Sequence, residues 1–527
     1  MMVLGLLTPF GCGFLNRYKV STHMPIMTPT PTPHEIELKL SLPTTDPAGL
    51  VQLLAKVPLL ARRKTQTLNL FNQYFDTPDQ ALRRQRCALR IRRVGEGDQV
   101  QWLQTLKNGA SDASALSQRG EWESPVSGPE LSLDVLADTA WAQMDRSGQL
   151  FASLQPCFVT EFQRTIWLIK RSNGSCVEVA LDIGTVLAGG QLAPICELEL
   201  ELKAGSPNDL FAVASSIAKS VAVLPANQSK AQRGFLLAQG DLFKPTRARA
   251  PSLIPELGAQ AMAQSVLREM FAQFTTNMLA LMSSDDAELV HQARVGWRRF
   301  RSILRLFKKL GLHSGVPSWV DMKPLLASLG AVRNLDVAVT ETLPMLLDGY
   351  SQGDVKRASA WLQMTQAVAG AAHSQREACR TELRQPAVGA TLLAMTQWLE
   401  GMTSTAQHSP TKETDQLRHW AKARIERLHH RLEQAQADAV SQVHDLERQH
   451  RVRILAKRLR YGVEALSDLL PKRQVRFCHA YASGLQTRLG DTRDLAQAGE
   501  LMAQLAVDAA MVAFVRGVVV GAAMTPV

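Results

Sequence analysis

Two short segments place acidic side chains and a lysine at alternating positions. The segment HEIELKL at 34–40 aligns Glu35, Glu37 and Lys39, and CELELELK at 196–203 aligns Glu197, Glu199, Glu201 and Lys203. On a β-strand, residues two apart share a face and lie about 6.5–7 Å apart. Carboxylates at that spacing can hold a hard divalent cation, and a neighbouring lysine can neutralise a phosphate oxygen. The predicted chemistry is therefore the binding of a metal-complexed polyphosphate.

The solvated outer face of an antiparallel sheet also alternates, and for one strand alone that is the simpler interpretation. Further segments, however, carry charges on one strand parity: Arg90 with Arg92, Arg119 with Glu121 and Glu123, and Glu178 with Asp182. Other segments add Lys107, Arg164, Lys230 and Arg233. A solvent-facing surface would mix such charges with Ser, Thr and Gln. The pattern favours faces that turn inward around a charged lumen. A lumen with both signs needs a metal and an anion to fill it, because unpaired buried charge is costly.

The elements that must position these residues are strands. Period-2 stretches occur at 34–41, 68–76, 87–93, 99–107, 118–123, 159–169, 176–187 and 195–203. This is enough to close an eight-stranded antiparallel β-barrel. Short helical segments near 47–57, 132–145 and 207–221 would cover its outside. A Pro-rich stretch at 244–258 reads as a linker, and beyond it apolar residues recur at three and four, which predicts an all-α bundle and an α+β chain.

The helical half contains a repeat at an offset of about 160 residues. HQARVGWRRFRS at 291 pairs with HRVRILAKRLRY at 450, and LGAVRNLD at 329 pairs with LGDTRDLA at 489. We expect repeats at about 257–400 and 415–527. The second pair of motifs is interpreted as helix junctions, where Asp336 or Asp494 caps a helix or pairs with an arginine.

The basic residues of the first motif pair are spaced at 0, 3, 7 and 10: His291, Arg294, Arg298 and Arg301, then His450, Arg453, Lys457 and Arg460. Such spacing spans about 80° of a helix surface. Two stripes could face a common groove that suits a long polyanion. A solvated basic face explains the same spacing equally well.

Composition agrees with an anionic partner. The 527 residues carry a formal net charge of +11, and aromatic residues make up only 6%, which disfavours stacking on single-stranded nucleic acid. Seven scattered cysteines without a CxxC pair indicate a reducing compartment, and we expect a cytoplasmic protein. Residues 1–33 are interpreted as a flexible extension. The apolar tail is interrupted by Asp508 and Arg516, which predicts a packed helix and no membrane span.

The ordered motifs resemble a known family. HEIELKL resembles the ExExK opening signature of the CYTH family, also called triphosphate tunnel metalloenzymes. The segments YFDTPDQALRRQRCALRIRR, ALDIG, CELELEL and SKAQRGF resemble its later strands, in the expected order. The helical half resembles a CHAD domain, and the tandem is similar to bacterial inorganic triphosphatases of the CYTH–CHAD type. The resemblance covers about 34–525, with no gap in the acidic or basic pattern. Only the N-terminal extension departs from it.

The resemblance implies hydrolysis of inorganic triphosphate to phosphate and pyrophosphate with Mg²⁺ or Mn²⁺. The predicted phosphate clamp is Lys39, Arg90, Arg92, Lys107, Arg164, Lys203, Lys230 and Arg233. The predicted metal ligands are Glu35, Glu37, Asp182, Glu197 and Glu199, and the predicted catalytic set is Glu35, Glu37, Lys39 and Lys107. Glu121, Glu123, Glu178 and Glu201 are left as outer ligands or a base. The CHAD-like half implies polyphosphate binding by the two basic stripes.

The expected domains are a tunnel domain at 34–243, a linker at 244–256 and a CHAD-like domain at 257–527. Two other functions stay open from sequence. One is a tunnel enzyme for nucleoside or thiamine triphosphate, or a cyclase acting on ATP. The other is a non-enzymatic polyphosphate-binding protein, against which the acidic set argues because anion binding alone needs only bases.

Overall fold

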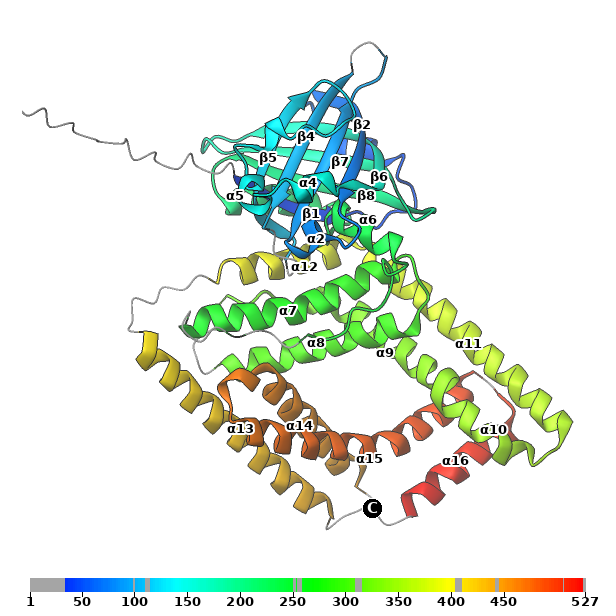
Figure 1. Cartoon of the computed structure of the whole chain (residues 1–527). Helices are drawn as coiled ribbons and strands as arrows, with labels where there is room; N and C mark the ends of the chain where they lie inside the picture. Colours follow the sequence, from blue (N-terminus) through cyan, green and yellow to red (C-terminus); the bar gives the residue numbers. More distant parts are fainter. Residues whose placement is uncertain are drawn as a thin grey trace, which may run out of the picture.

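The computed structural model describes residues 34–97, 100–109, 114–249, 253, 258–308, 315–402, 410–440, 445–505 and 507–524. The extension expected at 1–33 and most of 250–256 in the expected linker lie outside the described residues. A β-domain stands on a broad layer of helices, so the chain has two structurally distinct halves (Figure 1).

The β-domain is a closed antiparallel barrel, as predicted. Its strands are β1 His34–Ser41, β2 Thr65–Asp76, β3 Cys87–Val94, β4 Gln101–Asn108, β5 Leu116–Val126, β6 Gln155–Lys170, β7 Cys176–Ala188 and β8 Gln191–Ala204. The order is β5-β4-β3-β2-β6-β7-β8-β1, and pairing of β5 with β1 closes the ring. A two-residue strand, β9 Leu224–Pro225, adds to β1 outside the ring.

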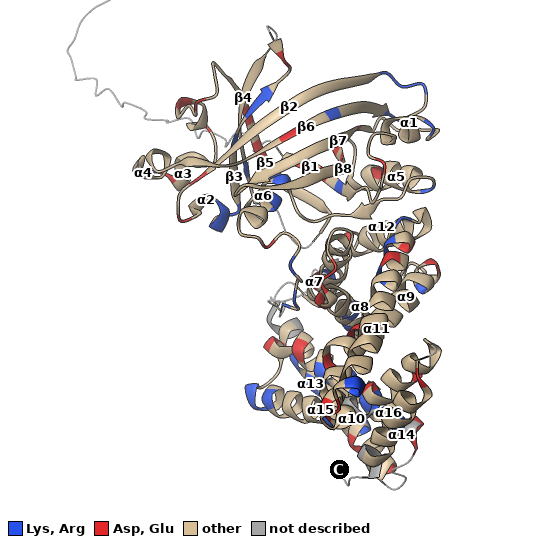
Figure 2. Ribbon diagram, turned by 90° about the vertical axis from the view of Figure 1, so that its right-hand side faces the viewer, with Lys and Arg blue, Asp and Glu red and all other residues tan. Residues whose placement is uncertain are grey.

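Alternation along the strands puts charge inside and apolar side chains outside. Acidic and basic segments lie along the same barrel strands (Figure 2). Directly opposite partners include Lys39 with Glu199 and Arg164 with Asp182. On the outer face, Leu38 is fully buried within the core formed with helices α1 Leu50–Ala55 and α5 Pro207–Ala218. The helices thus cover the apolar exterior and leave the polar faces to the lumen.

Three other short helices, α2 Ala81–Arg84, α3 Trp141–Met144 and α4 Gln149–Ala152, supply further outer cover. The last barrel-domain helix, α6 Lys230–Ala238, was expected as a strand, and that prediction is wrong. Ser229 caps the helix through the backbone N–H of Gln232, whose side chain accepts from the Ser229 N–H. This reciprocal capping box starts a helix, on which Lys230 and Arg233, three residues apart, share one side.

The C-terminal half is helical in all its described elements: α7 Gly258–Leu281, α8 Ala287–Phe307, α9 Lys323–Val337, α10 Leu343–Ser351, α11 Val355–Leu383, α12 Pro386–Glu400, α13 Pro410–Val440, α14 Leu446–Ala465, α15 Lys472–Gln504 and α16 Ala509–Met524. Phe274, Phe300 and Phe307 are fully buried in its main core. Met511, Val512 and Val515 of α16 are buried against α10 and α15, as expected for a packed tail. Among the described helices, none is long and apolar enough to cross a membrane.

The two LGxxR segments are not both helix junctions. Residues 329–336 reach almost to the end of α9, before a π-helical turn at Ala338–Thr342, but residues 489–496 lie inside the long helix α15, so the junction prediction is wrong there. Asp336 pairs with Arg376 at 2.6 Å, as expected for an acid–arginine pair. The duplication itself stays a prediction.

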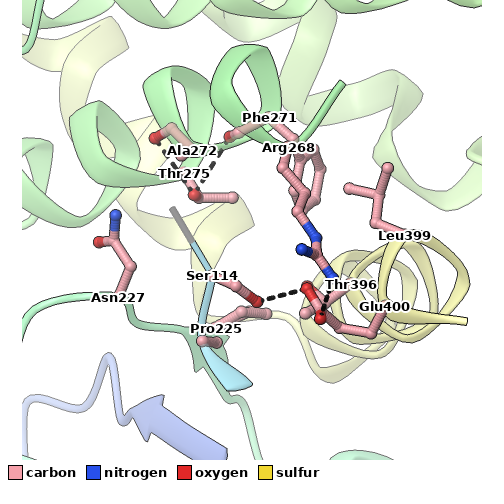
Figure 3. Close-up of a pocket in the computed structure, with 11 residues that line it drawn as sticks. Ser114, Pro225, Asn227, Arg268, Phe271, Ala272, Thr275, Thr396, Leu399 and Glu400 are labelled. Carbon is pink, nitrogen blue, oxygen red and sulfur yellow. Dashed lines mark hydrogen bonds and ion pairs between the residues drawn. The ribbon is translucent and has the colours of Figure 1, made fainter. Parts of the chain in front are cut away.

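The two halves pack tightly against each other. A Cβ atom on Gly389 of α12 would lie 2.1 Å from the carbonyl oxygen of Val223, so only glycine allows this approach. Leu393 of α12 is fully buried in the barrel-side core. Nearby, the Ser114 hydroxyl donates to Glu400 at 2.7 Å, and Glu400 also pairs with Arg268 of α7 (Figure 3). Helices α7 and α12 therefore form the floor on which the barrel stands.

Candidate functional site

A cavity of about 400 Å³ lies inside the barrel, and all eight ring strands contribute to its wall. We call this cavity the tunnel. Its charged lining is Glu35, Glu37, Lys39, Arg90, Arg92, Lys107, Arg119, Glu121, Glu123, Arg164, Glu178, Glu199, Glu201, Lys203 and Lys230. Three residues expected in the site, Asp182, Glu197 and Arg233, lie behind this lining and are joined to it by ion pairs.

One group of acids gathers around Lys230. Its Nζ lies 2.6 Å from Asp182 Oδ2, 2.5 Å from Glu197 Oε1 and 2.9 Å from Glu199 Oε1. One carboxylate oxygen from each acid lies within 4.8 Å of the others, a spacing at which the three could share a metal ion. Arg164 grips Asp182 with two hydrogen bonds of 2.7 Å. We call Asp182, Glu197 and Glu199 the acidic trio.

A second group gathers around Glu35. Lys107 Nζ lies 2.9 Å from Glu35 Oε2 and 2.9 Å from Glu121 Oε1. Arg119 donates from Nε to Glu35 at 2.8 Å and from Nη2 to Glu37 at 3.0 Å. Arg119 was absent from the predicted clamp, although it shares the parity of Glu121 on the same strand. The five acids predicted as metal ligands therefore form two separate groups.

Lys39 joins the two groups, because its Nζ lies 3.0 Å from Glu37 and 2.6 Å from Glu199. Burial alone would lower the pKa of Lys39, but the carboxylates of Glu199 and Glu37 raise it above its ordinary value. Burial likewise would raise the pKa of Glu199, but Lys230, Lys39 and Arg164 hold it well below its usual range. Lys39 and Glu199 are thus both charged at neutral pH.

Farther along the tunnel the balance shifts toward positive charge. Arg90 lies 3.8 Å from Glu121 and 3.8 Å from Glu123, and Arg92 lies 3.5 Å from Glu123. Burial, with the nearby charges of Arg90 and Arg164, lowers the pKa of Arg92 to about 10. Arg92 also donates to Asn72 at 2.9 Å, a polar lumen position that the sequence analysis did not single out.

Lys203 holds an outer place, with 40% of its side chain exposed and Glu201 at 2.7 Å. Arg233 pairs with Glu197 at 3.2 Å and also donates to the carbonyl of Pro194. Both are therefore more peripheral than the other residues of the predicted clamp.

The acidic trio fits a hard divalent cation, since carboxylate oxygens are the ligands that Mg²⁺ and Mn²⁺ prefer. Lys230 now balances the same oxygens that a metal would need. A bound cation would compete with its ammonium group, whose charge would then be available to an anion. The site can therefore hold a metal and a polyphosphate together.

A second concentration of charge lies in the helical half, where α8 and α14 meet. We call it the basic cluster: His291, Arg294, Arg298, Arg333, His450, Arg453, Lys457 and Arg493. Burial, with the charges of Arg298, Arg453 and Arg493, lowers the pKa of Lys457 to about 7. Arg493 Nη1 lies 2.9 Å from His450 Nδ1. The two predicted stripes thus converge in space.

Two cluster residues were missed, Arg333 and Arg493, although they occupy equivalent places in the paired motifs LGAVRNLD and LGDTRDLA. Two predicted members lie elsewhere. Arg301 lies over the ring of Trp319, 5.8 Å from its centroid, and Arg460 pairs with Glu464 at 3.4 Å. The repeat itself therefore carried a signal that the stripe spacing did not.

Comparison with known proteins agrees with both halves. The CYTH domain model matches residues 33–235, and the CHAD domain model matches residues 265–503. An inorganic triphosphatase of Haemophilus influenzae is 37% identical over 204 residues, which is 38% of this chain. The match spans 54% of that relative, so about half of its length is covered.

Solved structures with similar folds include a CHAD domain from the plant Ricinus communis, with 28% identity and a TM-score of 0.44 over 54% of this chain and 92% of that one. A putative adenylyl cyclase from Hippeastrum, described as having a dominant triphosphatase activity, has 18% identity and a TM-score of 0.29 over 39% and 95% of the two chains. The two family matches follow each other along the sequence, as the barrel and the helices do. The chain therefore combines an N-terminal CYTH domain with a C-terminal CHAD domain.

Proposed function

We propose that the protein hydrolyses inorganic triphosphate to phosphate and pyrophosphate in the tunnel, with Mg²⁺ or Mn²⁺ as cofactor. The observation that carries the proposal is the acidic trio, whose member Glu199 lines the tunnel, beside a row of buried cations that line the same cavity. Pure anion binding needs no carboxylates, whereas a metal-dependent phosphohydrolase needs both signs in one place. The Haemophilus influenzae relative, named an inorganic triphosphatase, supports this choice of substrate.

The tunnel residues divide by charge. Lys39, Arg90, Arg92, Lys107, Arg119, Arg164 and Lys230 would bind phosphate oxygens and offset the charge that develops during phosphoryl transfer. Lys203 and Arg233 would act at the periphery. Asp182, Glu197 and Glu199 would hold the cation, and Glu35 and Glu37 would hold a second cation or position the attacking water. When bound, such a cation supplies charge neutralisation and lowers the pKa of coordinated water.

The chain's own groups then perform orientation and water exclusion. The cavity is enclosed by eight strands, so electrostatic contacts inside it are less screened than at a surface. Lys39 lies between the two acidic groups and would contact a phosphate that spans them. Four further carboxylates would orient the basic side chains of the tunnel, and each is a candidate for the general base that activates water: Glu121, Glu123, Glu178 and Glu201.

The test is phosphate release from inorganic triphosphate, ATP and thiamine triphosphate, each with Mg²⁺, Mn²⁺ or EDTA. We expect turnover of the inorganic substrate to exceed that of both organic ones and to stop in EDTA. A preference for ATP or thiamine triphosphate would move the assignment to the organic alternative. Absence of turnover with either metal, together with tight polyphosphate binding, would contradict an enzymatic role.

We also propose that the basic cluster binds inorganic polyphosphate. The specific observation is the crowding of like charges: Arg298 and Arg333, added to burial, lower the pKa of Arg294 to about 10. Among the described residues, the acids near this group include Glu288, Asp336, Glu341 and Asp494. An anion would relieve the repulsion. Arg298→Gln with Arg453→Gln should weaken polyphosphate binding without changing triphosphate turnover, and equal binding by this variant and the wild type would contradict the assignment.

A further inference from the structure

A second cavity, of about 460 Å³, lies between the barrel and helix α7. We call it the interdomain chamber. Its barrel wall includes Lys39, Lys107 and Arg119, which also line the tunnel, so the chamber adjoins one end of the tunnel. Its opposite wall is formed by Gln273 and neighbouring residues of α7 and by the segment that leads into that helix. In this way the helical half covers the tunnel end that faces it.

The charged residues that line the chamber are mainly basic: Lys39, Arg83, Arg86, Lys107, Arg119 and Arg249, against Glu37 and Glu269. Six cations thus face two acids. On the tunnel side, Lys39, Lys107 and Arg119 are held by carboxylates. Arg86 and Arg249, in contrast, are exposed and form no ion pair with any residue that the structure describes.

A buried hydroxyl points to the same conclusion. Ser117 lines the chamber, and its Oγ is shielded from solvent and has no hydrogen-bond partner among the described residues. A buried polar atom normally has a partner, so a vacant hydrogen-bond position in a basic chamber favours an oxygen-rich anion. Arg83 is already in place, because it lies over the Phe235 ring at 5.1 Å and donates to Gln80 at 2.7 Å.

The far wall of the chamber is held in place by a buried arginine. Arg299 of α8 has 2% exposure and donates to Gln273 Oε1 at 2.9 Å and to the Arg249 carbonyl at 3.4 Å. Both acceptors belong to residues that line the chamber. The chamber is therefore a joint product of the two halves, and an isolated barrel would lack Arg249 and the α7 wall.

We propose that the interdomain chamber is a second anion site, which binds a short condensed phosphate such as pyrophosphate without a metal. In the tunnel, the basic side chains form ion pairs with carboxylates. They become available to an anion only when a metal ion coordinates those carboxylates, so anion binding in the tunnel requires the metal. In the chamber Arg86 and Arg249 need no such exchange. The identity of the anion rests on the proposed function, because pyrophosphate is its product and would reach the chamber directly from the tunnel.

The experiment is a calorimetric titration of the full chain with pyrophosphate in EDTA. Arg298→Gln with Arg453→Gln is included in every protein, so that the basic cluster contributes little. The test pair is Arg86→Gln with Arg249→Gln. The matched control is Arg84→Gln with Arg247→Gln, which removes the same charge from neighbouring residues that do not line the chamber. Arg86 has a φ of 57°, and glutamine adopts that conformation no worse than arginine.

We expect the test pair to weaken metal-free pyrophosphate binding at least about tenfold, since it removes two charged donors of hydrogen bonds to the anion. The control pair should change it less than about threefold, because those arginines act only through screened long-range charge. Equal losses from the two pairs, or no metal-free binding by the parent protein, would overturn the proposal.

Triphosphate hydrolysis with Mg²⁺ and Mn²⁺ is measured on the same proteins to separate the two proposals. In one outcome the parent protein hydrolyses no triphosphate, yet the test pair still weakens pyrophosphate binding. That result contradicts only the proposed function. In the other outcome the parent protein hydrolyses triphosphate, but the test and control variants bind pyrophosphate with equal affinity. That result contradicts only the proposed anion site in the chamber.

Discussion

The tunnel and the basic cluster both concentrate buried or half-buried cations, but they treat them in opposite ways. In the tunnel, burial alone would lower the pKa values of Lys39, Lys230 and Arg164, yet neighbouring carboxylates raise all three above their ordinary values. In the basic cluster, burial and like charges act together and lower the pKa values of Arg294 and Lys457. In the tunnel, neighbouring carboxylates balance the positive charges, whereas in the basic cluster the positive charges remain largely unbalanced.

This difference assigns the two regions different requirements for a ligand. An internally paired network has little net affinity for an anion until something removes its carboxylates, and a divalent cation does so. A crowded cationic group is relieved by any polyanion, with no metal involved. Arg92 is the exception within the barrel, because its pKa is lowered as in the basic cluster. It is therefore the tunnel residue whose positive charge neighbouring carboxylates compensate least.

The largest effect should come from breaking the acidic trio. Asp182→Asn is expected to lower kcat for inorganic triphosphate by at least about 100-fold, since even outer partners of a metal site change activity by about 10–100-fold. Phosphate release with Mg²⁺ and Mn²⁺ measures this, and circular dichroism confirms folding. Glu161→Gln, on the exposed face of β6, is the control. A folded Asp182→Asn protein with full activity would contradict the metal assignment.

The next test compares one substitution in both regions. Lys39→Met leaves Glu37 and Glu199 with less compensating charge and should lower the free energy of unfolding by about 3–5 kcal/mol. Lys457→Met removes a repelled cation and should leave that free energy unchanged or raise it by up to about 1 kcal/mol. Denaturant unfolding at pH 6, where Lys457 is protonated, measures both. Similar losses from both variants would remove the distinction between the regions.

A smaller effect is expected on polyphosphate binding as a function of pH. The pKa of Lys457 is about 7 in the free protein, so it is protonated below that pH and neutral above it. A bound polyanion raises this pKa, and binding above pH 7 therefore takes up a proton. Affinity should fall by up to about tenfold per pH unit above pH 7. Lys457→Gln should flatten the profile, and an unchanged slope would show that another group titrates.

The smallest effect concerns a contact between the barrel and the helical half. Ser114→Ala removes the hydrogen bond to Glu400, whose pKa burial raises despite Arg268 (Figure 3). We expect the free energy of unfolding to fall by about 1 kcal/mol. Exposed Ser220 provides the control, as Ser220→Ala. Equal unfolding midpoints for the two variants would mean that the Ser114 contact contributes nothing to the junction.

The side of each strand that is charged follows from the order of residues alone. A strand has a period of two, so Glu35, Glu37 and Lys39 must share a face wherever that strand lies. Eight such strands, with apolar residues at the intervening positions, leave a charged lumen and a helix-covered exterior as the solution that buries the apolar set. The same logic predicted the two basic stripes, because a helical period fixes their faces.

Which charges meet depends instead on how the strands and helices pack in three dimensions. Strand register and closure of β5 on β1 divide the acids into two groups, and a capping box at Ser229 delivers Lys230 from a helix. Packing of α7 against the barrel creates the interdomain chamber. The approach of α9 to α15 brings Arg333 and Arg493 into the basic cluster. Periodicity is a local property, whereas distances between elements depend on how the whole chain packs.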